Sequence, residues 1–137
     1  MAKKLNLLPD EDFILLGILT QEKDYRLCFE INRKLDMQFQ KDKDLEIIPG
    51  KQKESSSYSI YFFEDNEDHV FYILSNKGST SLLIPEQKQM DYFFMMKGNF
   101  SEEEKKDMLV KLREVPKVQG VYELEASKLK SKQNLVF

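Results

Sequence analysis

Residues 92–124 read YFFMMKGNFSEEEKKDMLVKLREVPKVQGVYEL, and this stretch decides the fold. Residues 92–96 are apolar at every position, which predicts a central strand covered on both faces. Ser101 followed three residues later by Glu104 forms a capping box, which predicts the start of a helix that ends before Pro116. Residues 118–124 alternate and predict a final strand with one wetter face, with Val118, Gly120, Tyr122 and Leu124 on the apolar side.

Upstream of this stretch, the sequence predicts a strand followed by a helix. Residues 13–19, FILLGIL, form a short apolar run in which Gly17 disfavours a helix, so we expect a strand. Apolar side chains then recur every four residues from Leu27 to Phe39, which predicts an amphipathic helix over residues 22–38. Residues 4–8 indicate a further short strand at the beginning of the chain.

The middle of the chain predicts a hairpin. Residues 58–63 and 70–74 are aromatic and β-branched, and the acidic turn 64–68 separates them. Residues 81–84 indicate another short strand. Residues 49–57 open with Pro-Gly and contain no large apolar side chain, so we expect a flexible loop there.

These elements predict one α+β domain over residues 1–137. We expect an antiparallel-rich sheet of about five strands with two main helices packed on it. The strand–helix–strand order of the C-terminal half is that of a ferredoxin-like split β-α-β unit, a layout that ligand-binding modules of the ACT type share. A short tail, residues 127–137, completes the domain and includes a short helical segment.

Composition excludes most catalytic and metal chemistry. The chain has 137 residues, 21 basic and 24 acidic, for a net charge of −3, with one cysteine and one histidine. A zinc site built on Cys and His needs about four ligands, and a nucleophilic triad would have to use His69. We therefore expect no metal, no cofactor and no enzymatic activity.

Charge and hydropathy also bear on partners and compartment. Only three of the basic residues are arginines, the side chain best suited to phosphate and guanine contacts, so we expect no nucleic-acid partner. The apolar run of residues 13–19 is far shorter than the ~20 residues that cross a bilayer, so we expect no membrane insertion. Without the apolar run of a signal peptide, a cytoplasmic location is expected.

One motif resembles a known family. Ile84-Pro85-Glu86, three further residues and then Met90-Asp91-Tyr92 resemble the signature of the bacterial IPExxxVDY family, with Met90 at the valine position. Residues 23–27 and 131–137 are similar too, so the resemblance spans nearly the whole chain. It implies a small intracellular protein and implies no reaction, cofactor or catalytic residue.

The motif has an architectural and a functional interpretation. As a corner between strands, Pro85 would start a helical turn, Glu86 would neutralise the N–H groups of that turn, and Tyr92 would bury its ring. Asp91 would bond a backbone N–H or pair with one of two cations, Arg26 or Lys97. In the functional interpretation, Glu86, Asp91 and Tyr92 form the polar rim of a ligand or partner pocket.

Other chemical candidates favour structural roles. The acidic turn with His69 lacks the spacing of a calcium loop and is expected to be a solvated turn followed by a strand histidine. Cys28 lies on the apolar stripe of the first helix and is expected in the core. Residues 135–137 are apolar, and they either dock on their own sheet or add to a partner's edge strand.

The expected function is therefore a protein–protein one. The absence of a catalytic constellation and the apolar tail favour a small non-enzymatic module that binds a protein partner or a second copy of itself. The alternative is an ACT-like domain that senses a small molecule in a pocket near Glu86, Asp91 and Tyr92.

Overall fold

The computed structural model describes residues 13–48 and 54–137. Its elements are β1 (Ile14–Thr20), α1 (Asp24–Leu35), β2 (Gln40–Lys41), β3 (Leu45–Ile47), β4 (Ser56–Tyr58), β5 (Ile60–Glu64), β6 (Val70–Ser75), η1 (Pro85–Gln87), β7 (Tyr92–Lys97), α2 (Glu102–Arg113), β8 (Val118–Leu124), η2 (Ala126–Lys128) and η3 (Lys132–Leu135), where η marks a 3₁₀ helix. Within these described ranges, neither helix has the length and apolar composition needed to cross a bilayer.

A six-stranded antiparallel sheet forms the centre of the fold. Its strand order is β2-β5-β6-β7-β1-β8, and every neighbouring pair is antiparallel. Strand β7, which contains the apolar run of residues 92–96, lies between β6 and β1, so the predicted central position of this run is confirmed. Strands β3 and β4 make a separate two-stranded sheet. The predicted α+β class is confirmed, with six strands in the main sheet where about five were expected.

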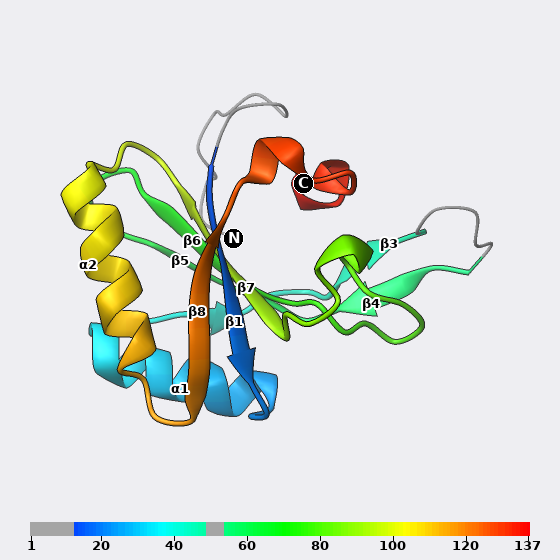
Figure 1. Ribbon diagram of the computed structural model, residues 1–137. Coiled ribbons are helices and arrows are strands. Elements are labelled where there is room, and N and C mark those ends of the chain that lie inside the picture. The colour runs from blue at the N-terminus through cyan, green and yellow to red at the C-terminus, as the bar shows by residue number, and fades with distance from the viewer. Residues whose placement is uncertain (1–12, 49–53) are drawn as a thin grey trace.

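The chain crosses from strand to strand through the two helices. β7 and β8 lie on either side of β1, so α2 connects two strands that are separated by a third. This is the split β-α-β arrangement predicted for the C-terminal half. Figure 1 shows α1 and α2 on one side of the sheet, with η2, η3 and the β3–β4 sheet on the other.

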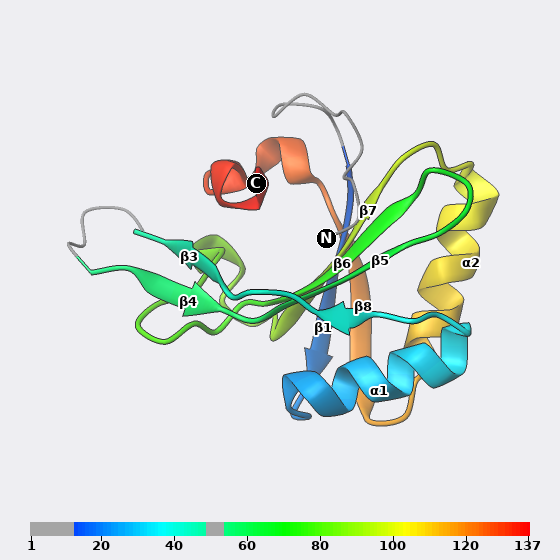
Figure 2. The same ribbon diagram turned by 180° about the vertical axis from the view of Figure 1, so that it is seen from behind.

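The sheet buries apolar side chains on both faces because successive residues of a strand point in opposite directions. On β1, Leu16 and Ile18 join the core beneath the helices, whereas Leu15 joins the core on the opposite face. The helices contribute Leu27, Ile31 and Leu112 to the first core. Figure 2 shows from behind how the elements cover the sheet, with α1 and α2 on one side and η2, η3 and the β3–β4 sheet on the other.

The core on the opposite face of the sheet is covered by loops and short 3₁₀ helices rather than by α-helices. Leu83 and Ile84 from the motif region, Met90, and Leu135 from the tail are buried against the sheet. The ring of Phe137 lies edge-on to Tyr72 at 5.1 Å between centroids. Of the two expectations for the apolar tail, docking on its own sheet is therefore the one that the structure contains.

Two predictions about loops and short strands need correction. Residues 81–84 are not a strand: the only pairing there is an isolated bridge between Lys77 and Leu82, because the N–H of Ile84 bonds the side chain of Asn76 instead. The loop expected over residues 49–57 gives way to strand β4 at Ser56, which is fully buried. Residues 49–53 of that loop and the strand expected at residues 4–8 lie outside the described residues.

The alternation predicted for residues 118–124 is interrupted near the start of the strand. Leu19 pairs with Gly120 but Thr20 pairs with Val118, so one residue of β8 is extra and forms a bulge. The bulge reverses the facing of the strand on its two sides. From Gly120 to Leu124 the pairing with β1 is regular, so Gly120, Tyr122 and Leu124 share a face as predicted, whereas Val118 lies on the other face together with Val121. Val121 is fully buried beneath the helices, and Tyr122 is 47% exposed.

Candidate functional site

The motif segment, residues 84–92, forms a corner that Asn76 holds in place. Asn76 follows β6 and is fully buried. Its side-chain Oδ1 accepts from the N–H of Ile84 at 2.8 Å, and its Nδ2 donates to the carbonyls of Gln87 and Met90 at 3.0 and 2.9 Å. All three bonds go to the motif segment, so one side-chain amide satisfies three backbone groups of the corner.

The first half of the motif ties the corner to the tail. Pro85 occupies the first turn of η1, as predicted, and Ile84 before it is fully buried. The Glu86 carboxylate accepts from the N–H of Ser131 at 2.7 Å and from its hydroxyl at 2.9 Å. Burial raises the pKa of Glu86, but these donors outweigh it and hold the pKa below its ordinary value. The carboxylate therefore holds a segment 45 residues further along the chain.

Asp91 ties the corner to β1. Its Oδ2 accepts from the N–H of Thr20 at 2.9 Å, and its Oδ1 lies 3.4 Å from the Lys77 ammonium. The predicted backbone bond is present, but the structure gives the ion pair to Lys77 rather than Arg26. Arg26 projects from α1 toward Glu22 and Glu30, at 3.7 and 3.6 Å.

The other predicted partner of Asp91, Lys97, lies elsewhere: its ammonium is over the rings of Tyr72 and Phe137, at 5.4 and 5.2 Å from their centroids.

Tyr92 behaves as the architectural interpretation predicts. Its ring is buried, and its hydroxyl donates to the carbonyl of Glu22 at 2.7 Å. Burial, with the nearby Asp24, Asp91 and Glu22 charges, raises its pKa to about 12.

A shallow pocket of about 340 Å³ lies beside the second half of the motif. Its lining comprises Thr20, Gln21, Glu22, Lys23, Ser75, Lys77, Asp91 and Tyr92. Glu86 is not part of this lining, so this pocket brings together only two of the three polar residues of the functional interpretation. Asp91 and Tyr92 do share it, although the inner polar atoms of both are occupied by Thr20 and Glu22.

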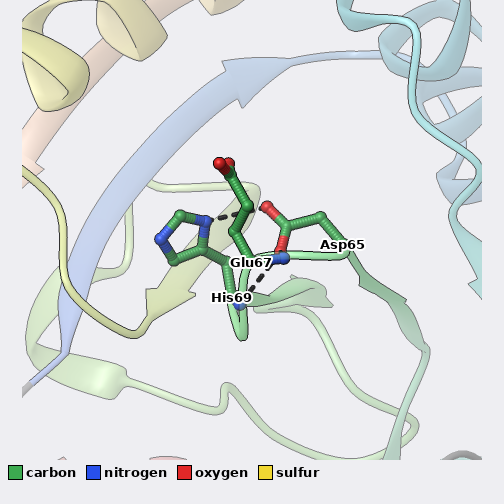
Figure 3. Close-up of side chains that lie close together, drawn as sticks. All are labelled: Asp65, Glu67 and His69. Carbon is green, nitrogen blue, oxygen red and sulfur yellow. Dashed lines mark hydrogen bonds and ion pairs between the residues drawn. The ribbon is translucent and has the colours of Figure 1, made fainter.

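The acidic turn and His69 come together at the end of the β5–β6 hairpin. Figure 3 shows Asp65, Glu67 and His69 on this turn, and their ligand-type atoms lie within 4.8 Å of one another. The Asp65 carboxylate, however, accepts from the backbone N–H groups of Glu67 and His69, at 2.8 and 3.0 Å. The imidazole bonds protein atoms through both ring nitrogens. These contacts order the turn, and the cluster by itself does not indicate a cation site.

Cys28 lies on α1 and its side chain is buried in the core, as the sequence predicts. Burial, with the nearby charge of Asp24, raises the pKa of its thiol to about 11. Its Sγ lies 3.8 Å from the carbonyl of Phe39 and 3.8 Å from the Asn32 amide. A neutral, enclosed thiol is a poor nucleophile and a poor metal ligand.

Among residues 13–48 and 54–137, only β1 pairs with strand β8, so within the described part of the chain the other edge of β8 is open, which the sequence did not indicate. At this open edge, Arg113 at the end of α2 donates from Nε and Nη2 to the carbonyl of Val121, at 3.1 and 2.8 Å. A hollow of about 370 Å³ runs along this edge, lined by Arg113 and residues 118–122. The hydrophobic side chains most exposed nearby are Val110 and Tyr122.

The sequence carries only weak signals for Asn76, which holds the corner, and for Arg113, which bonds the edge of β8. Asn76 stands in a polar turn, and any turn asparagine has the same appearance in a sequence. Arg113 is one of three arginines and stands in the last turn of a helix, where a cation is favourable without any further role.

Comparison with protein-family models, with curated proteins and with solved structures finds no match to this chain.

Proposed function

We propose that this protein is a small non-enzymatic module that associates with a second copy of itself through the edge of β8. The observation that carries the proposal is the open edge itself. β8 has seven residues, whereas the strand at the opposite edge of the sheet, β2, has two. An unpaired strand of this length is a template for another strand, and proteins that stay monomeric blunt such edges.

The direction of the backbone groups on β8 follows from its neighbour. The carbonyl of Ile18 accepts from the N–H of Asp91, so the polar backbone groups of Ile18 point toward β7. Its partner on β8, Val121, must therefore direct its own N–H and carbonyl away from β1, which is where Arg113 reaches it. Two residues further along β8, the backbone N–H and carbonyl of Glu123 point away from β1 in the same way.

A second copy fits this edge in an antiparallel arrangement with a two-fold axis at Tyr122. Val121 of each copy then faces Glu123 of the other, and both residues offer outward N–H and carbonyl groups. The two Tyr122 rings become cross-strand neighbours, a pair that favours aromatic residues. No like charges stand opposite each other in this register, and the exposed tyrosine is covered. A two-fold interface is self-complementary in this manner.

Arg113 controls access to this edge. Its guanidinium donates to the Val121 carbonyl, so a second β8 strand can pair there only after this hydrogen bond has broken. Hydrogen bonds to a charged donor are worth about 1.5–3 kcal/mol net, which is about 10- to 150-fold in an association constant. The arginine therefore makes self-association weak and concentration-dependent.

The test is analytical ultracentrifugation of four proteins over a wide concentration range. Arg113→Ala should dimerise more tightly than the wild type. Glu123→Pro removes an outward N–H without breaking the ladder to β1 and should abolish association, whereas the matched control Glu123→Ala keeps the N–H and should associate. Circular dichroism establishes that each variant is folded. A monomeric Arg113→Ala protein at every concentration, or equal association of the proline and alanine variants, would refute the proposal.

The alternative function is sensing of a small molecule in the pocket beside the motif. It is supported by the 340 Å³ pocket, where Lys23 and Lys77 stand beside Glu22 and Asp91. Both charge signs at close range suit a small zwitterion such as an amino acid. A thermal-shift screen of free amino acids tests this alternative, because a bound ligand must raise the melting temperature. No stabilisation at millimolar concentration would exclude it.

The proposal extends to family and compartment. The likeness of residues 84–92 to the IPExxxVDY signature is what supports membership of that bacterial family. A cytoplasmic location is supported by Cys28, the single cysteine, a buried free thiol. Fractionation of cells that produce the protein natively tests the location.

A further inference from the structure

His69 occupies a position with two hydrogen-bond acceptors and little solvent. The residue is 9% exposed, and its ring stacks on Phe100 with 4.2 Å between centroids. Its Nδ1 lies 2.8 Å from the Asp65 carboxylate and its Nε2 lies 2.9 Å from the carbonyl of Asn99. One ring thus connects the turn after β5 to the loop that leads into α2. Figure 3 shows the Asp65 side of this connection.

Both partners of the ring are acceptors. A backbone carbonyl has no proton to give, and an ionised carboxylate has none either. A neutral imidazole carries a single N–H and would direct a lone pair at one of the two oxygens. Only the imidazolium, with two N–H groups, satisfies both contacts.

The surrounding charges favour that cation. From its own turn, His69 faces Asp65 and the nearby carboxylate of Glu67, and from α2 it faces Glu104. Burial by itself lowers the pKa of His69, but the bonds to Asp65 and Asn99 and the two negative charges raise it overall. Burial likewise raises the pKa of Asp65, and the N–H donors of Glu67 and His69, with the His69 ring, bring it below its ordinary value.

We propose that His69 is a proton-operated clasp, whose protonated ring holds the acidic turn 65–69 against the loop 98–101 and whose deprotonation releases that loop. Loss of one proton removes a donor from one of the two bonds. The charged Asp65 carboxylate is the stronger acceptor and keeps the remaining proton on Nδ1, so the bond from Nε2 to the carbonyl of Asn99 is the one that is lost. The loop keeps the contact between Phe100 and the His69 ring, but it is open for a larger fraction of the time. The clasp is independent of the β8 edge.

The direction of the pH effect follows from the two partners. A histidine with a raised folded pKa stabilises the fold fully below its ordinary value of 6.5, and this contribution disappears as pH rises through the folded value. Asp65 has a lowered pKa, so its contribution is present above 3.8 and disappears as pH falls through the folded value. The clasp is therefore closed at mildly acidic pH and opens on the alkaline side.

Because the chain has one histidine, NMR can follow the clasp directly in the full-length protein. Ring ¹⁵N shifts report whether one or both nitrogens carry protons. We expect both to be protonated to a pH above the titration midpoint of the same histidine in the urea-denatured chain. A folded midpoint at or below the denatured one would overturn the proposal.

Asp65→Asn provides the decisive variant. The amide keeps an oxygen for the N–H groups of Glu67 and His69 but removes the charge, so the His69 midpoint should fall by about one unit or more. The control Glu67→Gln removes a neighbouring carboxylate that, among the described contacts, makes no bond to the ring, and it should shift the midpoint less.

Backbone ¹⁵N relaxation dispersion supplies the conformational readout, because it reports an open minor state of a loop without requiring hydrogen-bonded amides. In the wild type, the open-to-closed ratio at residues 98–101 should rise about tenfold for each unit by which the folded midpoint exceeds the denatured one. In Asp65→Asn this ratio should be high and independent of pH over the same range. Identical pH profiles for the two proteins would overturn the clasp.

Discussion

Substitution of Asn76 by alanine should destabilise the protein more than any other exchange of a single polar residue in the motif region. The change deletes three hydrogen bonds and leaves the N–H of Ile84 and the carbonyls of Gln87 and Met90 without their partner. Each bond contributes about 1 kcal/mol net, so the expected loss is about 3 kcal/mol, and more if the buried groups stay unhydrated. A loss of this size would lower the melting temperature by about 10 °C.

The measurement is urea unfolding, with the change read from the midpoint at constant slope. Asn99→Ala is the matched control, because the Asn99 side chain is exposed and its replacement should cost about 0.5 kcal/mol or less. Asn76→Asp sharpens the test: it keeps the acceptor for Ile84 but turns a carboxylate oxygen toward two carbonyls. It should therefore be at least as harmful at neutral pH and recover partly in acid. A loss below 1 kcal/mol for Asn76→Ala would refute the assignment of Asn76 as the organiser of the corner.

Two further predictions concern titratable groups. Glu86→Gln should cost about 1 kcal/mol at neutral pH by weakening the bonds to Ser131. Since the pKa of Glu86 is lowered in the fold, this difference from the wild type should vanish as pH falls below 4.5 through the folded value, as measured by urea titration at several pH values. Cys28, whose pKa rises to about 11 from 9.0, should react with a thiol reagent at least about 100-fold more slowly in the native than in the denatured protein; equal rates would contradict its burial.

The regular elements were predictable because their signals are local. The apolar run of β7 requires cover on two faces wherever it occurs, and the pair Ser101 and Glu104 bonds within one helical turn, with Glu104 N–H to Ser101 Oγ at 3.0 Å and Ser101 N–H to Glu104 Oε1 at 2.8 Å. The apolar repeat predicts the first helix, but α1 ends at Leu35, before the predicted end at residue 38. Asp36 adopts a left-handed conformation with φ of 54°, which ends α1 at Leu35.

The site was less predictable because its contacts join distant parts of the chain. Sequence patterns marked Glu86 and Asp91 as special, but their bonds to Ser131 and Thr20 span 45 and 71 residues. The motif has the form of a local turn, so the sequence suggested local partners for it. The pairing of Asp91 with Lys77 rather than Arg26 likewise depends on where α1 lies on the sheet.

The sequence by itself determined the α+β class, the two helices, the hairpin and the central strand, because hydrophobic periodicity and capping act over a few residues. Only the tertiary structure decided how the second face of the sheet is covered, which edge stays open and that Asn76 and Arg113 organise their surroundings. These features depend on packing and hydrogen bonds between segments far apart in the chain, and a single bulged residue in β8 is enough to put Val118 on the face opposite to Gly120, Tyr122 and Leu124. A pattern read along the chain carries no record of such contacts, since they exist only once the sheet has assembled.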